Sequence, residues 1–315
     1  MPPSPTLESR IRGGLYGVAV GDALGATLEF ETAESIRARW GELREIVGGG
    51  WLDLPPGAWT DDTEMTLALA EGILDDPADP LPHVGRRFLA WMESGPPDIG
   101  NTVRAVLRLM AQGEFSPREW HRAAKRVHRE LHGMSAGNGA LMRTLPVGLA
   151  YRDPEEVMAK AELLARMTHW DPRAAHSCML ASLVAFAMAW RDAPPGEALA
   201  WAADVLSSRV GEVAVEELAG LALRRSWGEL TPSGFTVESL ECALWGLLEA
   251  PDFEEAVVRV ANLGGDADTI AAITGGLAGV RWGFEAIPKR WVHALSPGQR
   301  GRLDRVAEGL LRLVG

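Results

Sequence analysis

The residues best suited to chemistry fall in two short acidic clusters, one in the first quarter of the chain and one in the last. The first is Trp59-Thr60-Asp61-Asp62-Thr63-Glu64, and the second is Leu263-Gly264-Gly265-Asp266-Ala267-Asp268-Thr269. Each cluster places two carboxylates and a threonine hydroxyl close together and then continues as an apolar helical pattern. Adjacent helix positions do not face each other, so we expect at least one carboxylate of each pair to lie on the turn before its helix.

Convergence of the two clusters would create a site for cations. Four carboxylates in one place repel each other unless some are protonated or cations lie among them. Hard oxygen ligands suit Mg²⁺ or Mn²⁺, and two such ions would offset the four charges. Each cluster alone could instead start a helix, with Thr60 or Asp61 as cap and Glu64 completing a capping box with Asp61. A cap needs only one carboxylate, whereas each cluster carries two and a hydroxyl, which favours metal binding.

The composition is that of a globular protein with an acidic surface. The chain has 315 residues, 47% of them apolar and 23% charged, and a formal net charge of −12. It has no tract rich in Lys and Arg, so we do not expect it to bind nucleic acid. Acidity does not exclude a small phosphorylated ligand, because metals and helix N-termini can supply the positive field.

Cysteine usage and the apolar runs predict a cytoplasmic protein. Cys178 and Cys242 lie in apolar helical stretches without a Cys-x-x-Cys pair, which indicates buried free thiols in a reducing compartment. The segment from Met1 to Arg12 lacks the apolar run of a secretory signal. The longest apolar run, Met179 to Trp190, is too short to cross a bilayer and predicts a buried helix.

Helix-start signals recur along the chain. Asp153-Pro154-Glu155-Glu156 has an N-cap followed by proline and acidic residues. Asp252 precedes a similar start with Glu255 in the capping-box position, and Ser116-Pro117-Arg118-Glu119 predicts another helix. Alternating β-type runs are scarce, and residues 44–51 fit a short hairpin or a loop.

A stretch of small residues, Gly13 to Ala26, predicts a helix that packs tightly against its neighbours. A Rossmann phosphate loop would need a preceding strand and the spacing Gly-x-Gly-x-x-Gly, and neither is present. Glu29 ends this stretch and could face a pocket. No breaker is long enough to be an interdomain linker. If the two acidic clusters form one site, the first and last quarters of the chain pack together, which predicts a single all-α domain over residues 1–315.

Two glycine-containing turns are further candidates. Residues 95–102 form a turn that leads into a helix from Val103, and Asp98 or Asn101 could be a plain helix cap. The alternative is that Asp98 faces a cationic leaving group. The turn from Ser135 to Arg143 contains glycines, which let backbone N–H groups approach a phosphate closely. His169, beside Trp170, could line a pocket.

Together these motifs resemble the ADP-ribosylglycohydrolase family. The resemblance spans most of the chain. It covers Gly17 to Glu29, Trp59 to Glu64, Asp98 to Thr102, Ser135 to Arg143, Thr168 to His176 and Asn262 to Thr274. The two acidic clusters, in this order and separation, are the specific part of the pattern.

The resemblance implies an all-α fold with a metal-lined cleft and two divalent cations, Mg²⁺ or Mn²⁺. The implied metal ligands are Thr60, Asp61, Asp62, Asp266, Asp268 and Thr269. Glu29 and Asp98 match the acidic residues that the family places near the metals and in the cleft, and they are the implied catalytic residues. The implied substrate-binding residues are Asn101, Thr102, Ser135, Gly137, Asn138, Gly139 and His169.

The activity implied is hydrolysis of the ribosyl C1″ linkage of an ADP-ribosylated protein, with release of ADP-ribose. The turn Pro97-Asp98-Ile99-Gly100 most resembles the arginine-directed members. Asp98 could then pair with the leaving guanidinium, and either Glu29 or Asp98 could serve as the general base. Three alternatives stay open: hydrolysis of ADP-ribosyl-serine, O-acetyl-ADP-ribose or another conjugate, a non-catalytic ADP-ribose-binding module, and a metal-dependent phosphohydrolase.

Overall fold

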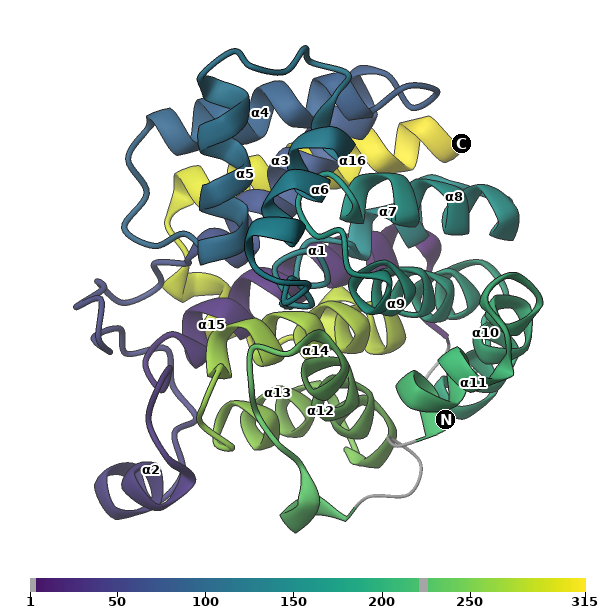
Figure 1. Cartoon of the computed structure of the whole chain (residues 1–315). Helices are drawn as coiled ribbons and strands as arrows, with labels where there is room; N and C mark the ends of the chain where they lie inside the picture. Colours follow the sequence, from purple (N-terminus) through teal and green to yellow (C-terminus); the bar gives the residue numbers. More distant parts are fainter. Residues whose placement is uncertain (1–3, 221–225) are drawn as a thin grey trace.

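The chain folds almost entirely into helices (Figure 1). The computed structural model describes residues 4–220 and 226–315. In these ranges the α-helices are α1 (Leu7–Gly25), α2 (Ala33–Trp40), α3 (Asp61–Asp75), α4 (Leu81–Glu93), α5 (Asn101–Ala111), α6 (Trp120–Glu130), α7 (Leu145–Ala150), α8 (Pro154–Ala165), α9 (Pro172–Trp190), α10 (Pro195–Val210), α11 (Glu212–Val215), α12 (Thr236–Glu249), α13 (Phe253–Ala261), α14 (Ala267–Trp282), α15 (Lys289–Ala294) and α16 (Pro297–Val314).

The predicted all-α fold is confirmed for this part of the chain. Its β-type pairing is confined to isolated bridges, which join Thr32 to Gly264, Gly49 to Leu54 and Gly137 to Phe235. The bridge between Gly49 and Leu54 closes a tight turn. Of the two alternatives for residues 44–51, the structure therefore shows loop and turn with one bridge, not a hairpin of two strands.

Two of the predicted helix starts are confirmed. Asp153 and Asp252 occupy the N-cap positions of α8 and α13, and their carboxylates accept hydrogen bonds from the N–H groups of Glu155 and Glu255 respectively. The side chain of Glu255 does not complete a capping box, because it binds Arg44 and Arg259 instead. A carboxylate in the first turn of a helix can bind a nearby arginine instead of the N-cap backbone N–H. Glu255 forms these ion pairs and not the capping box.

One predicted helix start was wrong, and one capping box is absent although its helix start is correct. The segment that begins at Ser116 forms a turn, and α6 starts only at Trp120, with Glu119 at the N-cap position. Glu119 closes that turn by accepting a hydrogen bond from the N–H of Ser116 at 2.9 Å. Glu64 forms no capping box with Asp61, because its carboxylate accepts from Trp59 Nε1 at 2.8 Å and pairs with Arg302 of α16 at 2.7 Å.

The centre of the molecule is a close contact between the first helix and a helix from the last quarter of the chain. Figure 1 shows α1 and α14 crossing the middle of the fold. A β-carbon added to Gly17 would lie 2.0 Å from the carbonyl oxygen of Gly275, and one added to Gly21 would lie 2.1 Å from that of Ala271. Only glycine leaves room for such backbone contact. The predicted tight packing of the small-residue helix is therefore confirmed, as is the pairing of the first and last quarters.

The remaining helices surround this pair. α13, α12 and α9 pack against α14, while α16 packs against α1 and α3. The apolar run that ends at Trp190 lies in α9 and is buried, as predicted, except at Trp190 itself, which is partly exposed. Cys178 and Cys242 are buried, and neither forms a disulfide within the described residues. Within the described ranges, every helix is too short or too polar to cross a bilayer.

Candidate active site

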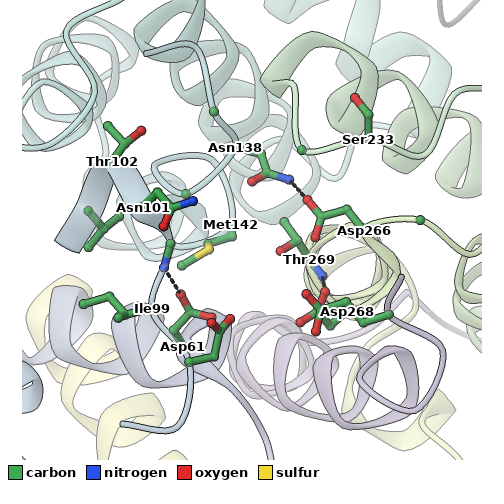
Figure 2. Close-up of a pocket in the computed structure, with 18 of the residues that line it drawn as sticks. Asp61, Ile99, Asn101, Thr102, Asn138, Met142, Ser233, Asp266, Asp268 and Thr269 are labelled. Atoms are coloured by element: carbon green, nitrogen blue, oxygen red, sulfur yellow. Dashed lines mark hydrogen bonds between the residues drawn. The ribbon is translucent and has the colours of Figure 1, made fainter. Parts of the chain in front are cut away.

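A cavity of about 700 Å³ lies where the N-termini of α3, α5 and α14 come together. Figure 2 shows Asp61 on one side of it and Asp266, Asp268 and Thr269 on the other. The predicted convergence of the two acidic clusters is thus what the fold produces. The α1–α14 contact is the cause, because it brings the chain after α1 beside the start of α14.

Asp22 of α1, which the sequence analysis missed, holds the first cluster in place. Its carboxylate is fully buried and accepts hydrogen bonds from the backbone N–H groups of Thr60 and Thr63, at 3.0 and 3.1 Å. It also accepts from both threonine hydroxyls. The available signal was a single carboxylate within the otherwise uncharged stretch from Gly13 to Ala26, since a charge is rarely buried unless it is paired or hydrogen-bonded.

Asp61 and Asp62 are the first two residues of α3, and Thr60 is its N-cap. The expectation that one of this pair lies before the helix was therefore wrong. The helix starts at Asp61 because the hydroxyl and backbone of Thr60 provide the cap. The two side chains still diverge: Asp61 lines the cavity and accepts from the N–H of Gly100 at 3.4 Å, whereas Asp62 is fully buried and contacts Thr269 of the second cluster.

The second cluster follows the expected arrangement. Asp266 occupies the N-cap position of α14, just before the helix, and Asp268 lies in the first turn. Asp266 Oδ2 accepts a hydrogen bond from Asn138 Nδ2 at 2.6 Å, drawn as a dashed line in Figure 2. Asp268 accepts from the backbone N–H of Thr269 at 2.8 Å. These contacts hold both carboxylates of the pair at the cavity wall.

The two clusters meet directly. The hydroxyl of Thr269 donates to Asp62 Oδ2 at 3.3 Å. The other oxygen, Asp62 Oδ1, is buried and has no hydrogen-bond partner among the described residues. Glu29, Asp266 and Asp268 each offer a carboxylate oxygen, and these three oxygens lie within 4.8 Å of one another. An unsatisfied buried carboxylate oxygen beside a cluster of hard oxygen donors fits divalent cations of the Mg²⁺ type.

Burial and mutual repulsion raise the pKa of these carboxyl groups. Burial is the largest cause throughout, and it raises the pKa of Asp61 to about 8 and that of Asp22 to about 6. The pKa values of Asp62 and Asp268 are also well above the usual range, first through burial and then through neighbouring carboxylates. The surrounding protein therefore supplies too little positive charge to keep all of these carboxyl groups ionised. A bound cation would reduce the repulsion among them.

Glu29 lies in the chain that follows α1 and lines the cavity. Trp51, on the turn after the triple glycine, donates its indole N–H to Glu29 Oε2 at 2.5 Å. Burial raises the pKa of Glu29 to about 7, against the opposing effect of the indole hydrogen bond. Trp51 is a second residue that the sequence analysis missed, because nothing in the sequence around it links it to Glu29.

The turn over residues 95–102 forms another wall of the cavity. Asp98 is half-buried and lines the space, as do Asn101 and Thr102 at the start of α5. The helix begins at Asn101, two residues earlier than expected, with Gly100 at the N-cap position and no side-chain cap. Neither Asp98 nor Asn101 serves as the plain cap that was the alternative interpretation, so both side chains are available to a ligand.

The second glycine turn also lines the cavity. Gly137, Asn138 and Gly139 all contribute to its wall. The N–H of Asn138 donates to the carbonyl of Gly234 at 3.0 Å, which ties the turn to the chain before α12. Ser135, by contrast, lies outside the lining, and its buried hydroxyl contacts His128 Nδ1 at 2.7 Å and the N–H of Asp171 at 3.3 Å.

His169 lies beneath the glycine turn and lines the cavity. A β-carbon on Gly139 would stand 3.1 Å from its ring, so a larger residue there would require the ring to shift slightly. The hydroxyl of Thr168 contacts His169 Nδ1 at 2.8 Å and accepts from Arg143 Nη2 at 2.7 Å. Because the Thr168 hydroxyl accepts from Arg143, it can donate its own proton to His169 Nδ1. This arrangement favours a neutral histidine ring with its proton on Nε2. Burial, aided by Arg143, lowers the pKa of His169 to about 3.

Arg143 is a buried cation that supports this part of the site. Besides Thr168, it donates to the carbonyl oxygen of Gly139 at 2.6 Å, so it fixes both the histidine and the glycine turn. Burial lowers its pKa to about 10, which leaves it charged at neutral pH. Arg143 and Thr168 both fall within the segments of the family resemblance, but their roles depend on contacts that the sequence does not reveal.

Comparison with known proteins settles the family. A sequence profile described as ADP-ribosylglycohydrolase matches residues 3–315. The chain belongs to the ADP-ribosylglycohydrolase family. This membership confirms the predicted resemblance and identifies the protein as an enzyme of the ADP-ribosyl hydrolase kind.

Individual relatives agree with this assignment. The chain is 32% identical over 314 residues to the ADP-ribosyl-(dinitrogen reductase) glycohydrolase of Rhodospirillum rubrum, with 99% of this chain and 98% of the relative covered. It is 30% identical over 318 residues to the ADP-ribosylarginine hydrolase Tri1 of Serratia proteamaculans (strain 568), covering 98% and 81%. A solved structure titled ADP-ribosylglycohydrolase-related protein complex superposes with a TM-score of 0.80 at 33% identity, covering 98% of this chain and 99% of that one.

Proposed function

We propose that this protein hydrolyses the bond between ribose C1″ and the guanidino nitrogen of an ADP-ribosylated arginine in a protein, releasing ADP-ribose. The observation that carries the proposal is the convergence of the two acidic clusters on one cavity, with the buried Asp62 Oδ1 left without a partner among the described residues. The names of two relatives, a glycohydrolase of ADP-ribosylated dinitrogen reductase and an ADP-ribosylarginine hydrolase, support the arginine linkage.

Two divalent cations, Mg²⁺ or Mn²⁺, are part of the proposal. The residues that would hold them are Thr60, Asp61, Asp62, Asp266, Asp268 and Thr269. When bound, such cations would neutralise the carboxylates and polarise the ribose hydroxyls and the attacking water. Asn138 would support this set through its hydrogen bond to Asp266, because a ligand oxygen held from its far side keeps its orientation.

The other cavity residues would bind the nucleotide part of the substrate. Gly137 and Gly139 let the chain approach a diphosphate closely, and His169 presents Nε2–H to an acceptor oxygen. Asn101 and Thr102 offer polar side chains and the exposed N-terminus of α5 on the facing wall. Ser135 would act indirectly, by anchoring the turn that carries Gly137.

Glu29 and Asp98 would carry the proton transfers. Glu29 lies beside Asp266 and Asp268, and its raised pKa brings it close to the pH at which a general base works well. Water would attack C1″ and transfer a proton to the Glu29 carboxylate, while the C1″–N bond breaks through an oxocarbenium-like state. The proton then passes to the departing nitrogen. Asp98, nearer the surface, would pair with the cationic guanidinium as it leaves.

Release of free ADP-ribose from an arginine-ADP-ribosylated protein tests this proposal. We expect release with Mg²⁺ or Mn²⁺ and none with chelator, and Asp268→Ala should lower kcat/KM by on the order of a hundredfold or more. Glu29→Gln should slow every conjugate, whereas the effect of Asp98→Asn should depend on the leaving group. Cleavage of only serine-linked or O-acetyl conjugates would contradict the arginine linkage, and ADP-ribose binding without cleavage would indicate a binding module.

A further inference from the structure

Two large aromatic side chains stand exposed at the rim of the cavity. Phe30 is 68% exposed and Trp51 is 51% exposed, and both line the cavity. Their ring centroids are 5.4 Å apart, with the planes tilted by 50°. Most other large apolar side chains of the described residues are buried, and a paired exposed aromatic surface beside a cavity indicates a binding role.

The backbone holds Phe30 in this position. Its φ angle is 63°, in the left-handed region that a bulky residue adopts only when its surroundings require it. Its N–H donates to the carbonyl oxygen of Gly265 at 2.7 Å, and the N–H of Gly265 donates to that of Glu31 at 2.8 Å. Asp266 follows directly. The two hydrogen bonds to Gly265 therefore help to position Asp266 and also hold the backbone of Phe30, whose ring is exposed to solvent.

Trp51 is held by a hydrogen bond at its indole N–H and by its contact with the Phe30 ring. Its indole N–H donates to Glu29, the residue before Phe30, while half of the side chain stays open to solvent. The Trp51 ring thus lies beside the Glu29 carboxylate, and both rings line the same cavity as Asp266. Under the proposed function these carboxylates flank C1″ and the group that leaves it. Because both rings line the cavity and are also exposed to solvent, a target side chain that reaches Glu29 from solvent can contact them.

We propose that Phe30 and Trp51 recognise the arginine side chain of the target protein, with the guanidinium held against their ring faces. This inference rests on the proposed function and deepens it. A guanidinium is planar and cationic, so it stacks on aromatic rings and also benefits from the negative charge of Asp98 nearby. A serine hydroxyl or an acetyl group offers neither the plane nor the charge. The pair therefore determines selectivity for the arginine linkage.

The test measures kcat/KM on an arginine-ADP-ribosylated peptide and, separately, the Kd of free ADP-ribose. Phe30→Asn removes the ring and suits the left-handed backbone, so the fold is preserved. We expect it to lower kcat/KM on the order of tenfold without changing the Kd of ADP-ribose. Phe30→Tyr keeps the ring face and should retain the wild-type value. Met134→Ala, an exposed apolar side chain outside the cavity lining, should change neither quantity.

Trp51 is tested by a matched pair of variants. Trp51→Phe keeps an aromatic face but loses the indole N–H, whereas Trp51→Ala loses both. Recognition by the ring face predicts a larger rise in KM for Trp51→Ala than for Trp51→Phe. Two results would overturn this inference alone, provided that the wild type cleaves the arginine peptide. One is an unchanged kcat/KM in Phe30→Asn. The other is a loss of ADP-ribose affinity in Phe30→Asn as large as its loss of kcat/KM. A wild-type protein that cleaves no arginine conjugate would overturn the proposed function and this inference together.

Discussion

Gly17 and Gly275 bring the backbones of α1 and α14 into direct contact. A β-carbon on Gly17 would lie 2.0 Å from the carbonyl oxygen of Gly275, and one on Gly275 would lie 2.2 Å from that of Gly17. This contact lies between helices from opposite ends of the chain, and the acidic clusters meet because of it. The glycine pattern of α1 therefore determines where the carboxylates of the candidate site lie.

Replacing Gly17 by valine should strongly destabilise the protein. Three extra carbons have no space against a backbone carbonyl, so the helices must separate, and we expect a loss of on the order of 3 kcal/mol or more in the free energy of unfolding. Chemical denaturation measures this loss. Gly196→Ala in α10 is the control, because a β-carbon there meets nothing within 4 Å. Comparable stability of the two variants would show that the α1–α14 contact is not required.

Asp22→Asn should impair both stability and catalysis. The Asp22 carboxylate accepts from the N–H and hydroxyl groups of Thr60 and Thr63, and an amide has only one oxygen to accept them. Leaving buried donors unsatisfied destabilises by about 1–3 kcal/mol, and the displaced Thr60 turn should lower activity as well. Asp204→Asn, on an exposed part of α10, is the matched control and should leave both the midpoint of denaturation and kcat/KM unchanged. Full activity in Asp22→Asn would contradict the positioning role.

Stability without divalent cations should decrease as pH rises. Burial raises the pKa of Asp61 from 3.8 to about 8 on folding, and it raises the pKa of Glu29 from 4.5 to about 7. The folded state therefore prefers the protonated carboxyl groups, so their contribution is fully present below the unfolded pKa and is lost as pH rises through the folded pKa. Thermal unfolding of chelator-treated protein between pH 4 and 8 should show this decrease.

Added Mg²⁺ or Mn²⁺ should reverse the decrease. Cations bind the ionised carboxylates of the folded state, so the increase in Tm on adding metal should be larger at pH 8 than at pH 5. Asp62→Asn is the informative variant, because it removes the carboxylate with the unpartnered buried oxygen. It should weaken the metal-dependent increase. An equal increase at both pH values would argue against a carboxylate metal site.

Thr168→Val should weaken the binding of ADP-ribose while preserving the fold. Valine matches threonine in shape but cannot accept from Arg143 or direct a proton at His169 Nδ1. We expect the ring to lose its fixed Nε2–H tautomer and the Kd of ADP-ribose to rise by on the order of tenfold, the value of a hydrogen bond to a charged group. Thr168→Ser keeps the hydroxyl and should bind normally.

The His169 tautomer is accessible by nitrogen NMR. The wild-type spectrum should show a neutral ring protonated on Nε2 between pH 5 and 8, because burial lowers the pKa of His169 to about 3. Thr168→Val should show a mixture of tautomers. A ring protonated on Nδ1 in the wild type would refute the proposed arrangement of Arg143, Thr168 and His169.

The sequence by itself determined the helical class, the helix starts at Asp153 and Asp252, and many of the cavity residues. Caps such as Asp153 act within a few residues, so the local pattern predicts them. The two acidic clusters were recognisable because a single cap does not need two carboxylates and a hydroxyl. Family resemblance then indicated Asp98 and the glycine turn, which the structure places in the cavity wall.

Only the tertiary structure decided how the side chains are used. The sequence around Glu64 suggests a helix cap, but in the folded protein its carboxylate pairs with Arg302. The sequence around Ser135 suggests a ligand contact, but its hydroxyl contacts His128. Asp22 and Trp51 bind groups that are distant along the chain, and no local pattern encodes such a contact. Local propensity fixes where helices start. The pairing of buried hydrogen-bond donors with acceptors depends on how the helices pack. In this protein the glycine contact between α1 and α14 determines that packing.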